Sequence, residues 1–149
     1  MKTVPLLSET GDIHYYEGLP DSGDYYGLFL TTDWNEEYCF TKEEIVFSVQ
    51  HTWYFISAYA GEKMVGTGAI ISDGIHHALI VNMIVHPDFR SQGIGTNILK
   101  LLVQKCKDCK VRDIQLFAAK NKYPFYLKHG FSFRPGDAPG MQLYMNAEI

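Results

Sequence analysis

Three stretches of the chain carry the apolar patterns of β-strands. Residues 53–60 and 63–72 are rich in aromatic and β-branched side chains, and Gly61-Glu62 separates them, so they predict a hairpin. Residues 78–85 are almost continuously apolar, which is typical of a strand that is covered on both faces. We therefore expect residues 78–85 to form the central strand of a sheet.

Helical periodicity follows this strand. Apolar side chains recur on one helical face after His86-Pro87, at Ile98, Leu102, Cys106 and Cys109. Residues 114–118 predict the next strand, which should lie parallel to the central one because a helix connects them. The sequence thus predicts a parallel crossover in the middle of the fold.

The rest of the chain gives shorter signals. Thr41 and Glu44 have the spacing of a capping box and predict a helix over residues 42–50. We also expect a strand at 13–17, a helical turn at 25–30, a helix at 123–129 that ends at Gly130, and a last strand pair at 131–134 and 141–146. The sum is a mixed α/β (α+β) fold with a mainly antiparallel sheet and flanking helices.

Composition bounds the function. With 149 residues, of which 46% are hydrophobic and 20% charged, we expect a single domain over residues 1–149. The net charge of −4 disfavours nucleic acid as a partner. No stretch reaches the roughly 20 apolar residues of a membrane span, and Pro5 interrupts the only apolar run near the start, so we expect neither a membrane partner nor a signal peptide. Three cysteines favour a cytoplasmic location.

A glycine-bearing loop between the central strand and the long helix carries the clearest chemistry. Gly93 and Gly95 allow the backbone to turn tightly and to approach a ligand, and the free amides of a helix start attract an anion. Arg90 adds a positive charge. The spacing fits neither a Walker A loop nor a complete dinucleotide fingerprint, so the residues alone indicate a pyrophosphate site of another kind.

Two motifs resemble those of the GCN5-related N-acetyltransferases (GNAT family). The first is Arg90-Ser91-Gln92-Gly93-Ile94-Gly95 after the buried strand. The second is the strand at 114–119 followed by Pro124-Phe125-Tyr126-Leu127-Lys128-His129-Gly130-Phe131. The resemblance covers the chain from about residue 63 onward. It implies the GNAT fold, in which the central strand and its parallel neighbour splay apart.

The resemblance also implies an activity, namely an acyltransferase of the EC 2.3.1 type that moves acetyl from acetyl-coenzyme A directly to a primary amine. Tyr126 matches the general acid that protonates the leaving thiolate. No metal is implied. The residues matched to cofactor binding lie on the strand, the loop and the second motif: Met83, Ile84, Val85, Arg90, Ser91, Gln92, Gly93, Ile94, Gly95, Thr96, Asn121 and Tyr126.

The general base is not assigned by the motifs. Relatives often carry a carboxylate on the central strand at the position of Asn82, and an amide cannot take up the proton. Asn82 either orients a water molecule or is a buried amide with satisfied hydrogen bonds. Water, His77, His86, Asp33 and Glu37 remain candidates for the base.

The amine acceptor is suggested only in outline. Aromatic side chains crowd the first third of the chain and predict either an acceptor pocket or a part of the core: Tyr15, Tyr16, Tyr25, Tyr26, Phe29, Trp34, Tyr38, Phe40 and Phe47. Asp33, Glu36 or Glu37 would attract a cation. Residues 134–141 resemble the tail of arylalkylamine-type acetyltransferases. A small-molecule amine is therefore expected, with a peptide amine as the alternative, and family members are commonly homodimers.

A second class of function stays open, namely a coenzyme A-binding sensor or scaffold without catalysis. The amide at Asn82 suggests this class, and Tyr126 disfavours it.

Two other clusters of residues have simpler interpretations. Cys106 and Cys109 are expected to be apolar residues on the inner helix face rather than metal ligands. His76 and His77 are expected at an exposed turn before the central strand.

Overall fold

A five-stranded sheet organises the first of two units in the computed structural model, which describes residues 12–145. The units divide between Leu116 and Phe117, and each is described by itself. The strands follow one another across the sheet in chain order: β1 (Ile13–Glu17), β2 (Tyr54–Ala60), β3 (Lys63–Ser72), β4 (His77–Val85) and β5 (Asp113–Leu116). The first four pair antiparallel and β5 pairs parallel to β4, which confirms the mixed sheet, the hairpin and the crossover.

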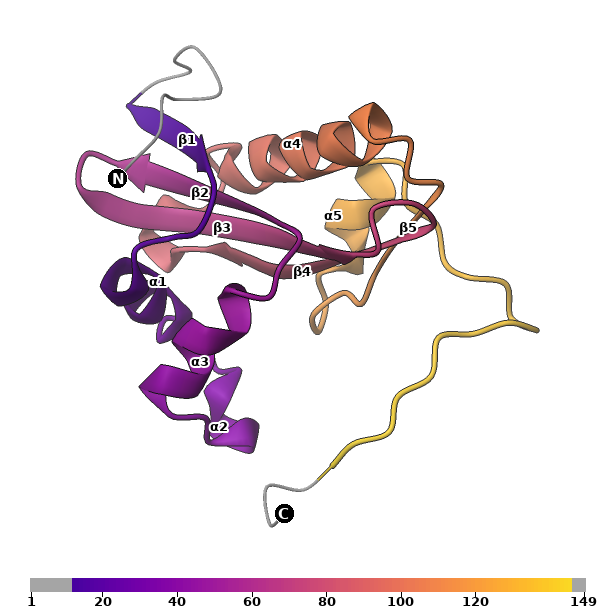
Figure 1. Ribbon diagram of the computed structural model, residues 1–149, viewed down its shortest axis with the longest axis horizontal. Helices are drawn as coiled ribbons and strands as arrows, with labels where there is room; N and C mark the ends of the chain where they lie inside the picture. Colours follow the sequence, from indigo (N-terminus) through magenta and orange to yellow (C-terminus); the bar gives the residue numbers. More distant parts are fainter. Residues whose placement is uncertain (1–11, 146–149) are drawn as a thin grey trace. The chain divides into compact units, whose positions relative to one another are not determined.

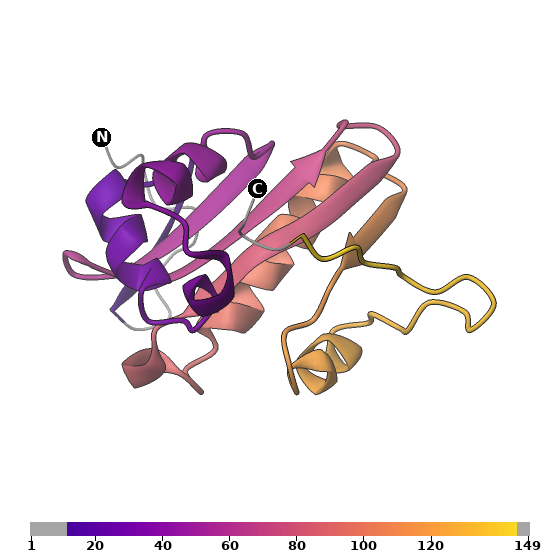
Figure 2. The same cartoon turned by 90° about the horizontal axis from the view of Figure 1, so that it is seen from below.

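Helices cover both faces of this sheet (Figures 1 and 2). On one face lie α1 (Ser22–Phe29), α2 (Asn35–Tyr38) and α3 (Lys42–Val49), and on the other lies α4 (Ile94–Asp108). The α3 helix begins with the predicted capping box, because the Thr41 side chain accepts from the Glu44 amide and the Glu44 carboxylate accepts from the Thr41 amide.

The packing of α4 depends on small residues in β3. Ile98, Leu99 and Leu102 of α4 are almost completely buried, as the periodicity predicts. A Cβ atom built on Gly68 would lie 2.6 Å from Ile98 Cγ2 and 2.9 Å from Leu102 Cδ1. The helix therefore approaches the sheet at a distance that only glycine permits.

One end of α4 differs from the expectation. Cys106 is fully buried, but Cys109 is exposed, because the helix ends at Asp108 and Cys109 is its C-cap. Burial raises the pKa of the Cys106 thiol, so it behaves as an apolar residue there. All three cysteines are free.

A bulge interrupts the pairing of β3 with β4. Thr67 is opposite Ile84 and Ala69 is opposite Val81, so Asn82 and Met83 together face Gly68. Asn82 adopts a left-handed conformation with φ = 55°, and its carbonyl oxygen accepts a hydrogen bond of 3.0 Å from Thr67 Oγ1. The central strand is thus bent halfway along its length.

The second unit contains α5 (Tyr123–Lys128), whose C-cap is His129; the predicted glycine, Gly130, follows it in a left-handed conformation (φ = 87°). The last strand pair is not formed, since the structure has no strand at 131–134 or at 141–145, while Asn146 lies outside the described residues. Within this segment the Ala138 amide donates to Pro135 O, which is a local turn bond. The alternating apolar residues supplied the pattern of a strand, but a strand also needs a paired neighbour, and the Leu143 side chain is 85% exposed.

Among residues 12–145, no helix has the length and apolar character needed to cross a membrane. The expected absence of a signal peptide concerns the start of the chain, which lies outside the described residues.

We predict that Gly68→Ala destabilises the protein by about 1–3 kcal/mol, because the added methyl group overpacks the contact with α4. Gly27→Ala, in α1, is the matched control, since its Cβ would meet nothing within 4 Å and alanine is the better helix former by up to about 1 kcal/mol. Urea unfolding measures both. Equal stability of Gly68→Ala and the wild type would contradict the tight packing of α4.

Candidate active site

The sheet opens along β4 after Ile80. The parallel pairing with β5 joins only four residue pairs, from His77 with Asp113 to Ile80 with Leu116. The strand β4 continues to Val85, and on this side no strand among the described residues pairs with residues 81–85. Met83, Ile84 and Val85 therefore lie on an open edge, whose backbone groups are available to a ligand.

A turn at the carboxyl end of β4 leads directly into α4. The 3-10 helix η1 (Pro87–Phe89) is capped by His86, whose Nδ1 accepts from the Asp88 amide at 3.1 Å. Ser91 (φ = 63°) and Gly93 (φ = 79°) both adopt left-handed conformations before the first helical residue, Ile94. These two reversals bring the start of α4 to the end of the open strand.

The start of α4 has the properties of an anion site. Gly93 is its N-cap and provides no side-chain cap, so the amides of Ile94, Gly95 and Thr96 have no partner within the helix. A Cβ at Gly93 would meet nothing within 4 Å, so the space before the helix is open. Arg90 is exposed and makes no ion pair with a described residue. The arrangement fits a pyrophosphate, which the dipole of this 15-residue helix would also attract.

The sequence-predicted residues fall into two groups. Those from Met83 to Thr96 lie together in the first unit, on the open part of β4 and on the turn and helix start that follow it. Asn121 and Tyr126 belong to the second unit, where Asn121 is exposed with φ = 62°.

Tyr126 is held by its aromatic neighbours in the second unit. Its ring makes edge contacts with Phe125 (centroids 5.1 Å apart) and Phe131 (6.0 Å). The side chain is half-buried, its hydroxyl has no hydrogen-bond partner among the described residues, and burial raises its pKa. At neutral pH the hydroxyl therefore keeps its proton and is available as a donor.

The candidate bases are distributed unevenly. His77 lies in the paired part of β4, at the opposite end from Val85, where its Nδ1 is 3.3 Å from Asp113 Oδ2. His86 lies at the carboxyl end, but its Nδ1 already accepts a hydrogen bond. Asp33 precedes α2 and Glu37 lies on α2, and both are exposed. Asn82 is half-buried, and its side chain has no hydrogen-bond partner among residues 12–145.

The aromatic residues of the first third divide between core and surface. Tyr15, Tyr25 and Phe29 are buried, and burial raises the pKa of Tyr25 to about 12. Tyr16, Tyr26 and Trp34 pack at the margin of the core. Tyr38, Phe40 and Phe47 are exposed. The rings of Tyr38 and Phe40 are stacked, 5.3 Å apart at 10°, next to the carboxylates of α2.

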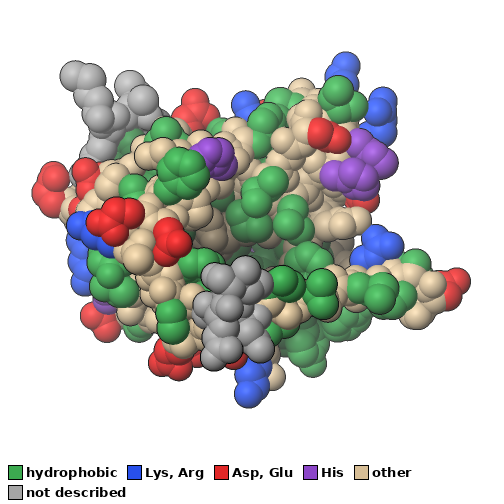
Figure 3. Space-filling model, turned by 60° about the horizontal axis from the view of Figure 1, so that its bottom comes forward, with side chains coloured by type: hydrophobic (Ala, Val, Ile, Leu, Met, Phe, Trp, Pro, Cys, Tyr) green, Lys and Arg blue, Asp and Glu red, His purple; other side chains and the backbone are tan. Residues whose placement is uncertain are grey.

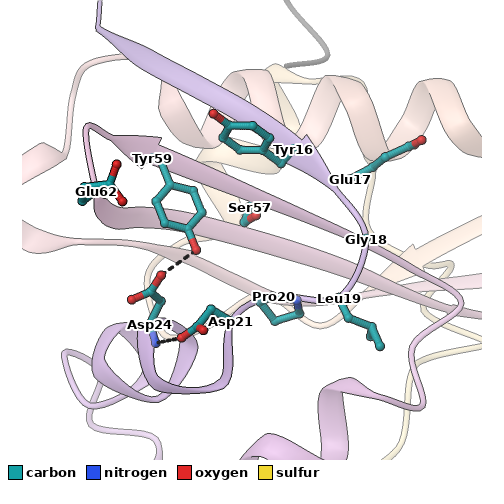
Figure 4. Close-up of a pocket in the computed structure, with 10 residues that line it drawn as sticks. All are labelled: Tyr16, Glu17, Gly18, Leu19, Pro20, Asp21, Asp24, Ser57, Tyr59 and Glu62. Carbon is teal, nitrogen blue, oxygen red and sulfur yellow. Dashed lines mark hydrogen bonds between the residues drawn. The ribbon is translucent and has the colours of Figure 1, made fainter. Parts of the chain in front are cut away.

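An acidic pocket of about 410 Å³ was not found from the sequence (Figure 4). Glu17, Asp21, Asp24 and Glu62 contribute its carboxylates, and Tyr59 Oη donates to Asp24 Oδ2 at 2.8 Å. Burial and this bond raise the pKa of Tyr59. The acids come from β1, the start of α1 and the β2–β3 turn, so no local motif connects them. The pocket does not include the open part of β4.

Comparison with known proteins agrees with this geometry. The family model described as an acetyltransferase (GNAT) domain matches residues 31–138. The chain belongs to the GNAT family. Its fold resembles that of a GNAT family acetyltransferase from Streptococcus pneumoniae, with a TM-score of 0.75, 21% identity, and coverage of 91% of this chain and 99% of that one. A predicted acetyltransferase from Clostridium acetobutylicum, solved with acetyl-CoA, has a TM-score of 0.66 and 21% identity, over 89% of this chain and 96% of that one.

Two curated relatives match part of this GNAT chain. The uncharacterized N-acetyltransferase ycf52 of Pyropia yezoensis is 34% identical over 85 residues, or 57% of this chain and 49% of the relative. Serotonin N-acetyltransferase 2, chloroplastic, of Oryza sativa subsp. japonica is 28% identical over 76 residues, or 51% of this chain and 38% of the relative. The chain spans about half the length of the first curated relatives it matches.

We predict that the Tyr126 phenol ionises above its ordinary pKa of about 10, because burial disfavours the phenolate. Ultraviolet titration of the wild type minus that of Tyr126→Phe isolates this one group. A midpoint at or below the ordinary value would show that Tyr126 is well solvated and would contradict its burial.

Proposed function

We propose that the chain is a single N-acetyltransferase domain over residues 1–149, which transfers acetyl from acetyl-CoA directly to a primary amine of a small molecule. One observation carries the proposal. The open edge of β4 ends in a left-handed turn and a free helix start, so backbone groups with the capacity to hydrogen-bond an extended chain lie next to amides with the capacity to bind a pyrophosphate.

Acetyl-CoA fits this arrangement in its chemistry. Backbone groups at Met83, Ile84 and Val85 offer partners to the amides and the thioester carbonyl of the donor substrate. The loop and helix start bind its pyrophosphate through backbone amides, and an arginine adds charge: Arg90, Ser91, Gln92, Gly93, Ile94, Gly95 and Thr96. Asn121 contributes a further contact. The anionic cofactor is thereby held by groups next to it, which is necessary because the net charge of the chain is −4.

The transfer needs one proton to leave the amine and one to reach the thiol. The amine nitrogen forms a bond with the thioester carbon, and the carbon–sulfur bond breaks. Tyr126 gives its hydroxyl proton to the leaving thiolate, which its raised pKa supports because the hydroxyl stays protonated until that step. Water takes the proton of the amine, because Asn82 is an amide and Nδ1 of His86 is already bonded.

In this proposal the acceptor is an arylalkylamine, which carries an aromatic ring and a primary alkylamine. The exposed, stacked rings of Tyr38 and Phe40 offer an apolar surface, and Glu36 and Glu37 on the same short helix attract a cation. The name of the rice relative, a serotonin N-acetyltransferase, supports the same class. The free cysteines support a reducing compartment such as the cytoplasm.

We predict that Tyr126→Phe lowers kcat by about 100-fold or more with little change in the Kd of acetyl-CoA, because the variant loses only the proton donor. Release of free thiol from acetyl-CoA measures turnover against arylalkylamines, polyamines and peptide amines, with a no-acceptor blank. Tyr123→Phe, on the same helix, is the control with expected normal turnover. Unchanged turnover in Tyr126→Phe removes the residue from the mechanism. Binding of acetyl-CoA without turnover for every amine would favour a coenzyme A-binding sensor.

We also predict that Gly93→Ala weakens coenzyme A binding by about 10-fold or more, because alanine strains the left-handed turn that presents the helix amides. Gly74→Ala is the matched control, since Gly74 has φ = 78° but lies at the other end of the sheet. Both variants should lose comparable stability in thermal unfolding. Isothermal titration with coenzyme A distinguishes them, and equal affinity in the two variants would refute the assignment of this turn.

A further inference from the structure

Two histidines and an aspartate, residue types that can ligate a metal ion, gather at the closed end of the parallel pair, where β4 and β5 begin. His76, His77 and Asp113 each offer one ligand atom, and these atoms lie within 4.8 Å of one another. His77 Nδ1 is 3.3 Å from Asp113 Oδ2, and the two imidazole rings are stacked 3.6 Å apart. Figure 3 shows histidine side chains gathered at the molecular surface.

Backbone hydrogen bonds hold the two histidines in place. Asp73 Oδ1 accepts from the amides of Ile75, His76 and His77 at 2.8, 2.8 and 3.3 Å, and these bonds lower the pKa of Asp73. Ser72 Oγ donates to the carbonyl oxygen of His77. The turn that presents both imidazoles is therefore ordered by its own side chains before any ligand binds.

The carboxylate is held from the neighbouring strand. The Asp113 amide donates to His76 O at 2.9 Å, and the register places Asp113 opposite His77. Gln115 Nε2 donates to Asp113 Oδ2 at 2.8 Å, which orients the carboxylate. Such a partner behind a ligand is common at metal centres, where its loss costs about 10–100-fold in affinity.

We propose that His76, His77 and Asp113 bind a divalent transition-metal ion of the zinc type, with water at the remaining positions. Two imidazole nitrogens and one carboxylate oxygen favour zinc, cobalt, nickel or copper over magnesium or calcium. Bonds of about 2.0–2.2 Å to a tetrahedral ion separate its ligands by about 3.3–3.6 Å, and the His77–Asp113 distance already has this value. The side chains of His77 and Asp113 are 59% and 42% exposed, so water can reach the ion.

The site is separate from the acetyltransferase site. His77 and Val85 are the first and last residues of β4, eight residue steps apart, which corresponds to at most about 26 Å at about 3.3 Å per step. The ion joins the start of β4 to the start of β5, so its effect is to stabilise the paired part of the two strands. The proposal therefore does not depend on the proposed activity.

Isothermal titration of the metal-free, full chain with zinc chloride tests the site. We expect one equivalent to bind to the wild type, and an affinity at least about 10-fold lower in both His77→Ala and Asp113→Asn. His51→Gln is the control, since His51 is an exposed histidine on another part of the chain, and it should bind like the wild type. Circular dichroism without metal checks that all variants are folded.

Two further readouts separate this site from other zinc ligands. Zinc at about 100 times its Kd should raise the Tm of the wild type by about 5–10 °C and leave the Tm of Asp113→Asn nearly unchanged. Bound cobalt should show ligand-field bands without the thiolate charge-transfer band that Cys39 or Cys109 would give. Equal zinc affinity in all four proteins, thiolate bands in the cobalt complex, or no stoichiometric binding would overturn the proposal.

Discussion

The short parallel pairing between β4 and β5 is the constraint on which the rest of the structure depends. A parallel neighbour can be reached only through a crossover, and here the crossover is α4. The pairing lasts for four residue pairs, whereas β4 has nine residues. The first half of the strand is therefore satisfied by two neighbours, and the second half keeps backbone groups for a ligand. A longer β5 along the same edge would remove the opening.

The bulge in β4 and the glycine opposite it belong to the same arrangement. Asn82 and Met83 share the position opposite Gly68, which bends the strand where the opening begins. Because Gly68 has no side chain, α4 packs closely over this point, and Ile98 and Leu102 fill the space. The tight packing fixes the helix, and with it the position of the helix start at the end of the open strand. Core packing and ligand geometry are thus set by the same residues.

Local sequence signals predicted the elements whose partners are local. The capping box at Thr41, the periodicity through Ile98 and Leu102, and the turn at Gly61 each specify structure within a few residues, and each is confirmed. The strands expected at 131–134 and 141–146 were wrong over the described residues, because an apolar alternation does not supply a pairing edge. Cys109 was expected on the inner face of the helix but lies one residue beyond the end of α4, since periodicity does not reveal where a helix ends.

The glycine motif revealed the helix start because all of its residues are consecutive. The separation of the two parallel strands was predicted from the resemblance to the GNAT family. The hydrophobic run alone indicates that β4 is central but does not indicate where its pairing stops. The acidic pocket and the cluster of His76, His77 and Asp113 were not predicted from the sequence, because their residues come from separate elements. Their proximity depends on strand register, and a shift of one residue in register would turn Asp113 to the opposite face.

The two ends of β4 differ in what the backbone leaves unsatisfied. At the open end the unpaired groups are peptide amides and carbonyls, which suit an extended and anionic ligand held by directional hydrogen bonds. At the closed end backbone groups already have partners in the protein: the amides of Ile75, His76 and His77 donate to Asp73, and the Asp113 amide donates to His76 O. The side chains gathered there are two imidazoles and a carboxylate, which suit a cation. Pairing that stops partway along one strand therefore places the two proposed sites, which differ in charge preference, at its two ends.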